Sequence, residues 1–204
     1  MAKLLYINSS VRNTGSLSRQ LSAEFVAKWQ AGNPEGSVVE RDLMRNPLPH
    51  LTEQLIGAYY TAPEARNADQ AHTIKLSDTL VDELIDADVL VIGAPMYNFS
   101  VTSGLKAWID HVARVGRTFK YGANGPEGLL NNTKVYVFIA SGGVYSTGPA
   151  AGFDHLSTYL RSVLGFLGLT DVSFIRAEGV GQGEAAVASA LASSRVAIAE
   201  ALPA

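Results

Sequence analysis

Five short runs of hydrophobic residues recur along the chain and are separated by longer amphipathic segments. The runs are Leu4–Asn8, Val38–Asp42, Val89–Ala94, Val135–Ala140 and Val172–Ala177. Because their apolar positions are mostly continuous rather than alternating, they are typical of strands that are covered on both faces. The second run also contains Glu40 and Arg41, which predicts that it lies at an edge of the sheet.

The segments between these runs predict helices. In Ser16–Gln30, apolar residues recur at four-residue steps and form one stripe that can pack on a sheet. The other predicted helices are Asp69–Ile85, Ser103–Val115, Phe153–Leu167 and Glu184–Ala201. Strands that alternate with helices in this way predict an α/β fold, with a five-stranded, doubly wound parallel sheet of order 2-1-3-4-5 and helices on both faces.

The sequence contains no internal repeat, no low-complexity segment and no flexible linker, so we expect residues 1–204 to form a single domain. Met44–Arg66 is the one long irregular connection, with a short helix predicted at Glu53–Tyr60. This connection carries more leucine, isoleucine and tyrosine than a free loop should expose. It packs either onto its own domain or onto a second copy of the chain.

Composition excludes several classes of function. The net charge is −3 without a basic stripe, which argues against a nucleic-acid partner. The absence of cysteine excludes thiolate nucleophiles and cysteine-ligated metals, and the four histidines lack the spacing of a zinc site, so we expect no metal. No apolar stretch reaches the roughly 18 residues that span a bilayer. With no leader cleavage site after the first apolar run, we expect a cytoplasmic protein that does not enter the membrane.

Open sheets of this kind bind ligands beyond the carboxyl ends of the strands, where the strand order reverses. The first loop at that edge, Asn8–Leu21, lacks the glycine patterns of dinucleotide and P-loop sites. It offers several hydroxyls instead, among them Ser10, Ser16 and Ser18, next to the start of a helix. This combination favours a terminal phosphate monoester. Alternatively, Ser16 only caps the helix and the remainder is polar loop.

The second loop at that edge follows the third strand. Pro95 cannot donate a hydrogen bond to a neighbouring strand, so we expect pairing to stop there. Met96, Tyr97 and Phe99 then place large apolar side chains where turn residues are usual. They either contact a planar ring or plug a local gap in the core.

The third loop, Ile139–Gly148, contains Gly142 and Gly143. Glycine permits positive φ and lets backbone N–H groups approach a ligand, where they could stabilise negative charge on a heterocycle; a flexible turn is the alternative. The three loops together favour a ligand with a phosphate at one end and a planar ring at the other. Flavin mononucleotide (FMN) fits this description better than an adenine dinucleotide does.

At this point the sequence resembles a known family, the FMN-dependent NADH-azoreductases of the flavodoxin-like fold, which also act as quinone reductases. The resemblance covers essentially the whole chain. It is carried by APMYNF at Ala94–Phe99, Leu105-Lys106, FKYGANGPEGLL at Phe119–Leu130 and GFLGLTDVSFIRAEG at Gly165–Gly179.

The resemblance implies FMN bound at a homodimer interface, with NADH or NADPH as the electron donor. The residues that it places at the cofactor are Ser10, Ser16, Leu17, Ser18, Pro95, Met96, Tyr97, Asn98, Phe99, Ala140, Ser141, Gly142 and Gly143. Tyr121 and Tyr145 either wall the substrate cavity or are ordinary exposed or core tyrosines. Ser141 stands where the family commonly has an arginine, which changes the charge expected near the ring.

The function implied is the reduction of azo compounds, with reductive cleavage of the azo bond, and of quinones. Hydride would pass from NAD(P)H through FMN to the acceptor. Because the flavin has room for one flat molecule at a time, we expect ping-pong turnover. FMN carries the chemistry, so no catalytic side chain is expected. The alternatives are a flavodoxin-type electron carrier, although such carriers are typically shorter and strongly acidic, and a flavin-binding module that turns over no organic substrate.

Overall fold

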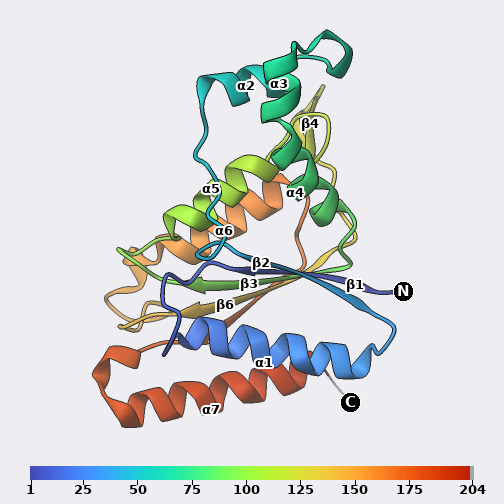
Figure 1. Cartoon of the computed structure of the whole chain (residues 1–204). Helices are drawn as coiled ribbons and strands as arrows, with labels where there is room; N and C mark the ends of the chain where they lie inside the picture. Colours follow the sequence, from blue (N-terminus) through green and yellow to red (C-terminus); the bar gives the residue numbers. More distant parts are fainter. Residues whose placement is uncertain (203–204) are drawn as a thin grey trace.

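A computed structural model describes residues 1–202 and contains one parallel sheet of five strands in the order β2-β1-β3-β6-β7. Its strands are β1 (Lys3–Asn8), β2 (Ser37–Asp42), β3 (Val89–Pro95), β6 (Lys134–Ala140) and β7 (Val172–Ala177). The predicted strand order is therefore confirmed, and β2 lies at an edge as expected. All five strands run in the same direction, so their carboxyl ends meet at one edge of the sheet, on the left in Figure 1.

Helices cover both faces of the sheet (Figure 1). The first layer is formed by α1 (Leu17–Gly32) and α7 (Glu184–Ala201), and the second by α4 (Lys75–Ile85), α5 (Ser103–Val112) and α6 (His155–Phe166). Each layer encloses its own core. Phe25 of α1 packs with Tyr136 and Phe138 of β6 in the first core. Trp108 of α5 and Leu160 of α6 are buried in the second.

Besides α1, which spans Leu17–Gly32 where Ser16–Gln30 was predicted, three predicted helices differ from the observed ones. The segment predicted as Asp69–Ile85 forms two helices, α3 (Ala68–Thr73) and α4, and Asn67 begins α3 with a capping box. The helix predicted to end at Val115 stops at Val112. The reason is local: the Thr118 hydroxyl accepts a hydrogen bond from the Arg114 N–H and donates one to the Val112 carbonyl, which turns the chain.

The third difference is at the start of α6. A 3₁₀ turn at Ala151–Phe153 precedes it, and Asp154 caps the helix by accepting a hydrogen bond from the Ser157 N–H. The helix predicted from Phe153 therefore begins at His155.

As expected, strand pairing ends at Pro95. Pro95 is the last residue of β3, and the next N–H, that of Met96, still donates to the Ala140 carbonyl at 2.8 Å. Successive N–H groups of a strand point to opposite sides. The N–H that Pro95 lacks would therefore face β1, whose pairing with β3 ends at Gly93. The proline costs the sheet no hydrogen bond.

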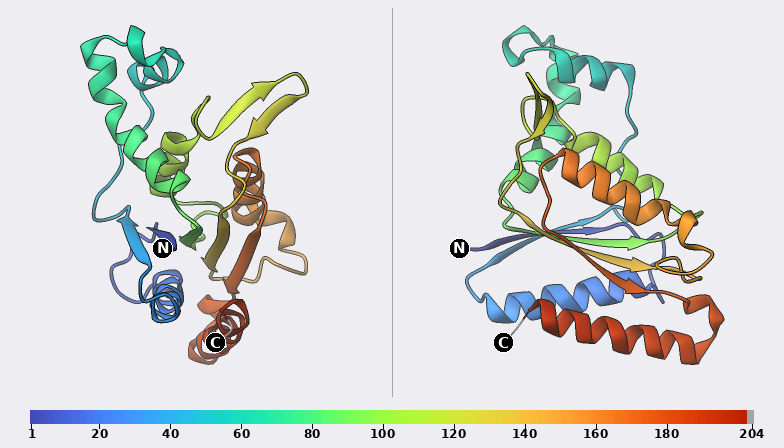
Figure 2. Two further views of the ribbon diagram at one scale, coloured as in Figure 1. Left: turned by 90° about the vertical axis from the view of Figure 1, so that its right-hand side faces the viewer. Right: turned by 180° about the vertical axis from the view of Figure 1, so that it is seen from behind.

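The long connection after β2 carries α2 (Glu53–Tyr60), a 3₁₀ turn at Pro63–Ala65, and α3. It projects from the sheet, as does an antiparallel hairpin of β4 (Phe119–Gly122) and β5 (Gly125–Gly128) that the sequence pattern did not predict (Figures 1 and 2). The apolar residues of α2 are only partly buried within the chain. Leu55 and Ala58 are buried, whereas Ile56 and Tyr60 are 43% and 71% exposed.

Among residues 1–202, no helix is both long enough and apolar enough to cross a membrane. The same residues contain no cluster of three or more histidine, aspartate or glutamate side chains placed to hold a metal ion.

Candidate functional site

Three hydroxyls of the first loop meet at the start of α1. The Ser16 Oγ donates to the Ser10 Oγ at 2.8 Å and lies 3.3 Å from the Ser18 Oγ. Ser16 is also the N-cap of α1, because its Oγ accepts from the Arg19 N–H at 3.4 Å. In the part of the chain that the structure describes, the N–H groups of Leu17 and Ser18 donate no hydrogen bond. Ser16 therefore caps the helix and also belongs to a group of donors suited to an anion.

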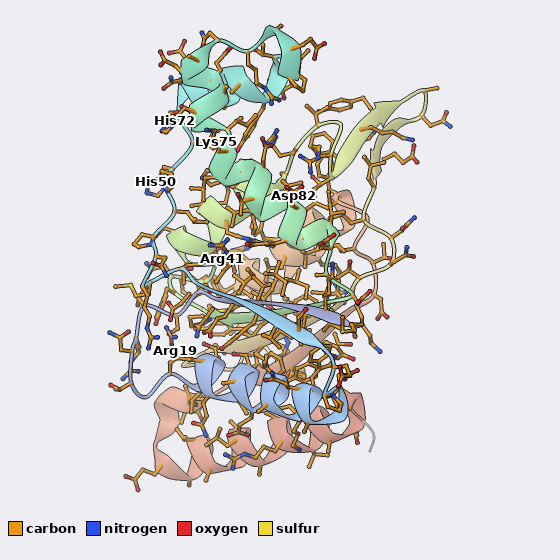
Figure 3. The ribbon with its side chains drawn as sticks, turned by 45° about the vertical axis from the view of Figure 1, so that its right-hand side comes forward. Arg19, Arg41, His50, His72, Lys75 and Asp82 are labelled. Atoms are coloured by element: carbon orange, nitrogen blue, oxygen red, sulfur yellow. The ribbon has the colours of Figure 1, made fainter. Side chains whose placement is uncertain are left out.

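Arg19 fixes the position of this loop. It lies in the first turn of α1 (Figure 3) and donates to the Ser10 carbonyl at 3.1 Å and to the Asp42 carboxylate at 2.6 Å. Burial alone would raise the pKa of Asp42. The hydrogen bonds from Arg19, the Arg45 N–H and the Met44 N–H outweigh burial and lower that pKa below its ordinary value. The ion pair between Asp42 and Arg19 therefore links the end of β2 to the first loop, Asn8–Leu21.

Gly93 of β3 allows α1 to lie close to the sheet. A Cβ at this position would be 3.0 Å from the Ser22 Oγ and 3.4 Å from the Ser18 carbonyl oxygen. The Ser22 hydroxyl is already committed, donating to the Ser18 carbonyl at 2.7 Å and lying 2.8 Å from the Tyr6 hydroxyl. The glycine therefore helps to place the first turn of α1 at the carboxyl edge of the sheet.

The second loop contains a strained turn. Asn98 and Phe99 have φ angles of 50° and 69°, and they are the residues other than glycine with positive φ in the described chain. Tyr97 and Ser100 close the turn with reciprocal hydrogen bonds of 3.2 and 3.1 Å. Positive φ costs such residues about 1–3 kcal/mol and is concentrated at functional sites. The N–H groups of Asn98 and Phe99 donate no hydrogen bond within residues 1–202.

The third loop is fixed by its own backbone. The Gly179 N–H donates to the Gly143 carbonyl, and the Gly181 N–H to the Gly142 carbonyl, both at 3.0 Å. The Ser141 hydroxyl donates to the Gly143 carbonyl at 2.9 Å. Positive φ was expected at Gly142 and Gly143 and is not observed. It is Gly181 whose lack of a side chain matters here. A Cβ at position 181 would lie 3.1 Å from the Gly142 carbonyl oxygen, so glycine allows the two backbone segments to pack closely.

A cavity of about 530 Å³ lies between these loops. The predicted residues that line it are Ser16, Leu17, Pro95, Met96, Tyr97, Ala140, Ser141 and Gly142. A second hollow of about 240 Å³ shares Met96, Ser141 and Gly142 with it and adds Asn98, Phe99 and Tyr145. Ser10 and Ser18 lie buried behind the cavity wall, in contact with Ser16.

Besides Ser10 and Ser18, two predicted residues lie outside these hollows. Gly143 lies in the third loop but lines neither of them. Tyr121 lies on β4, is 67% exposed and packs edge-on against Phe119, so within one chain it does not reach the cavity. Tyr145, by contrast, lines the second hollow, with its ring centroid 5.9 Å from that of Phe99.

Sequence reasoning missed other residues of the cavity. Arg12 is the one charged side chain among the lining residues, and in the described chain it forms no ion pair. Its position among the serines of the first loop was the sequence feature that pointed to a role in the site. Val180, Gly181 and Val187, from the connection into α7, also line the cavity. Nothing in their residue types distinguishes them from ordinary packing positions.

The donors at the two ends of the cavity differ in kind and fit FMN. Clustered hydroxyls and a helix N-terminus suit a phosphate. At the other end and in the adjoining hollow lie Met96, Tyr97 and the N–H groups of Asn98, Phe99 and Gly142, which donate no hydrogen bond within residues 1–202; this suits a flat ring with polar edges. Fold and site together define a flavodoxin-like α/β protein with a site shaped for a flavin mononucleotide.

Comparisons with known proteins agree with this class. A family model described as flavodoxin-like fold matches residues 2–202. An FMN-dependent NADH:quinone oxidoreductase of Herminiimonas arsenicoxydans is 59% identical over 204 residues, which is 100% of both chains. Another protein of that name, from Mesorhizobium japonicum, is 49% identical over 189 residues, covering 93% of this chain and 90% of its own.

Among solved structures, an azoreductase from Bacillus anthracis str. Sterne superimposes with a TM-score of 0.92 at 29% identity, covering 99% of each chain. The chain belongs to the family of FMN-dependent NADH:quinone oxidoreductases, which confirms the resemblance seen in the sequence.

Proposed function

We propose that this protein is an FMN-dependent oxidoreductase that takes electrons from NADH and reduces quinones and azo compounds, cleaving the latter at the azo bond. The observation that carries the proposal is the pairing of two kinds of donor across two adjoining hollows. At one end is the Ser16 hydroxyl, with those of Ser10 and Ser18 behind it; at the other are the N–H groups of Asn98, Phe99 and Gly142, which donate no hydrogen bond within residues 1–202. The names of the relatives support the choice of donor and acceptor.

At the phosphate end, the N–H groups of Leu17 and Ser18 and the three hydroxyls would hold the phosphate oxygens. The positive end of the α1 dipole favours an anion there. Arg12 lines the same end of the cavity and adds a formal positive charge. The phosphate end therefore anchors the cofactor and fixes which way it enters the site.

At the ring end, FMN when bound supplies the redox chemistry, accepting a hydride from the nicotinamide and passing it to the acceptor. The N–H groups of Asn98, Phe99, Gly142 and Gly143 would orient the ring and favour negative charge on it. Met96 and Tyr97 exclude water from the apolar part of the ring. None of these roles requires a side chain to act as nucleophile, in keeping with the sequence-based expectation.

Nicotinamide and acceptor would use the same space in turn. Hydride transfer requires the reacting atoms within about 3–3.5 Å of one another, so two flat molecules cannot both hold the productive position. Phe99 and Tyr145, whose rings meet edge to face at 80°, wall that space on one side. The expected order is ping-pong, with the oxidised nicotinamide leaving before the acceptor enters.

A homodimer is part of the proposal. Leu51, Ile56 and Tyr60 are 38%, 43% and 71% exposed on the connection that projects from the sheet. Exposed apolar groups of this kind mark interaction surfaces. A second chain packed there would bury them, and the predicted role of Tyr121 in the substrate cavity depends on such a partner, because Tyr121 does not reach the cavity of its own chain.

Steady-state kinetics test the proposal. The flavin-loaded protein should oxidise NADH when a quinone or an azo dye is present, with NADPH measured alongside. Plots of reciprocal rate against reciprocal NADH concentration should give parallel lines at several acceptor concentrations. Intersecting lines would contradict the shared site. Flavin binding without turnover of any acceptor would favour the electron carrier or the flavin-binding module instead.

A further inference from the structure

Glu178 ties the third loop to the end of β7. Its carboxylate accepts hydrogen bonds from the Tyr145 N–H and the Ser146 N–H, both at 2.9 Å, and from the Ser146 hydroxyl. The Arg176 guanidinium lies 3.5 Å from the same carboxylate. The side chain is 11% exposed, so a largely buried carboxylate has its oxygens satisfied by one short stretch of loop and one cation.

Arg176 extends the connection to α6. Its second guanidinium nitrogen donates to the Asp154 carboxylate at 2.8 Å. Asp154 is the N-cap of α6, and the N–H of the next residue, His155, donates to the Phe99 carbonyl at 3.1 Å. The row Glu178–Arg176–Asp154 therefore reaches both loops of the ring end, one through Tyr145 and the other through Phe99.

Aromatic contacts also join these loops. The Phe99 ring lies 5.9 Å from the Tyr145 ring and 5.3 Å from the Phe153 ring, measured between centroids. Phe99 is held with positive φ, a conformation that persists only where the surroundings enforce it. Glu178 takes up the N–H groups of Tyr145 and Ser146, whereas those of Gly142 and Gly143 in the same loop donate no hydrogen bond within residues 1–202.

We infer that Glu178 is a positioning residue for the ring end of the site: it holds Tyr145 and the Gly142–Gly143 backbone where they can orient the flavin ring and admit a flat acceptor. The inference rests on the proposed function. Glu178 lines neither hollow, so it acts through the loop and not by touching the ring. Within residues 1–202, this row forms no hydrogen bond or ion pair with Ser10, Ser16 or Ser18, so the phosphate end should not respond to it.

The test compares Glu178→Ala and Glu178→Gln with a matched control, Glu83→Gln. Glu83 forms a paired hydrogen bond with Arg41, is 17% exposed and lies on α4, away from the cavity. Apoprotein is titrated with FMN and with riboflavin, which lacks the phosphate, and the Kd is read from flavin fluorescence. Hydrogen exchange of the Tyr145 and Ser146 amides is followed in the same proteins.

Loss of the Glu178 hydrogen bonds should raise the Kd of both flavins by the same factor, about tenfold in Glu178→Ala. Glu178→Gln should recover most of that loss, since its amide oxygen still accepts from the backbone N–H groups, and Glu83→Gln should bind as wild type. The Tyr145 and Ser146 amides should exchange faster in Glu178→Ala alone.

Unchanged Kd values in Glu178→Ala, an equal loss in Glu83→Gln, or a loss confined to FMN would overturn the inference while leaving the proposed function in place. Wild-type protein that binds neither flavin would overturn the proposed function and this inference together.

Discussion

The side-chain oxygens of Ser10 and Ser16 lie 2.8 Å apart, although the two residues are six positions apart in the sequence. The loop between them folds back onto the first turn of α1, and Arg19 holds it there through the Ser10 carbonyl. Ser10 is fully buried and Ser16 lies at the cavity wall, so the pair joins the interior of the fold to the ligand site. The fold itself therefore brings together the hydroxyls of the proposed phosphate end.

Replacing Ser18 with Asp should weaken FMN binding selectively. The change removes a hydroxyl donor and puts a carboxylate next to the phosphate, with an expected loss of about 1–3 kcal/mol from the hydrogen bonds, before charge repulsion is counted. Isothermal titration with FMN and riboflavin measures the effect. Riboflavin binding serves as the control for folding, because Ser18 is buried; an equal loss for both ligands would mean that Ser18 is not at the phosphate end.

Replacing Gly93 with Ala should destabilise the fold by about 1–3 kcal/mol, because the new methyl group would press on the Ser22 hydroxyl 3.0 Å away. Chemical denaturation measures the loss. In the double variant with Ser22→Ala the obstructing oxygen is gone, so the two changes together should cost less than the sum of each alone. Strict additivity would show that Ser22 is not what the methyl group meets.

Much of the fold could be predicted because the five strands carry continuous apolar runs, and α1 and α7 begin at or within one residue of the predicted positions. The β4–β5 hairpin was missed because Gly125–Gly128, which reads GPEG, has none of the residues that usually mark a strand. The end of α5 was missed because it depends on Thr118, which lies beyond the helix in the sequence.

The free energy of unfolding should fall as the pH drops below about 4, and Asp42 should contribute to that fall. In the folded protein its pKa lies below the ordinary value of 3.8. The stabilisation is therefore complete above the pKa of the unfolded chain and is lost as the pH falls through the folded pKa. Denaturation at a series of pH values should give a shallower slope for Asp42→Asn than for wild type.

The same variant also tests the loop. With Asp42 neutralised, Arg19 loses the partner that holds it beside the Ser10 carbonyl, so FMN binding at neutral pH should weaken as well. Asp154 also has a lowered pKa, because the hydrogen bonds from Ser157 and Arg176 outweigh its burial, and it provides the comparison. Asp154→Asn should flatten the pH dependence without selectively affecting the phosphate end. Identical slopes in wild type and both variants would contradict the assignment.

The proposed dimer depends on the exposed apolar face of α2. Replacing Ile56 with Glu should convert a dimer into a monomer, because an ionised carboxylate would have to be buried in the interface. Light scattering at micromolar concentration reports the mass. Val196→Glu on α7 is the matched control, since Val196 is also exposed, at 59%, but lies on the opposite layer. A wild-type protein that is already monomeric would exclude this interface.

Less of the site than of the fold could be predicted. The hydroxyls, the apolar turn residues and the glycine pair are recognisable because their residue types are unusual in loops at that edge. The contributions of Arg12, Val187 and Glu178 depend on how loops distant in the sequence meet, and only the folded chain brings them together. The strain at Asn98 and Phe99 likewise appears only in the backbone angles.

Flavin content is the most direct test of the central claim that this cavity binds FMN. The purified protein, incubated with FMN and passed through a desalting column, should keep the flavin absorbance bands at about one FMN per chain, the stoichiometry of a single cofactor site. Anaerobic addition of NADH should then bleach those bands. A protein that leaves the column colourless after incubation with excess FMN would contradict the account.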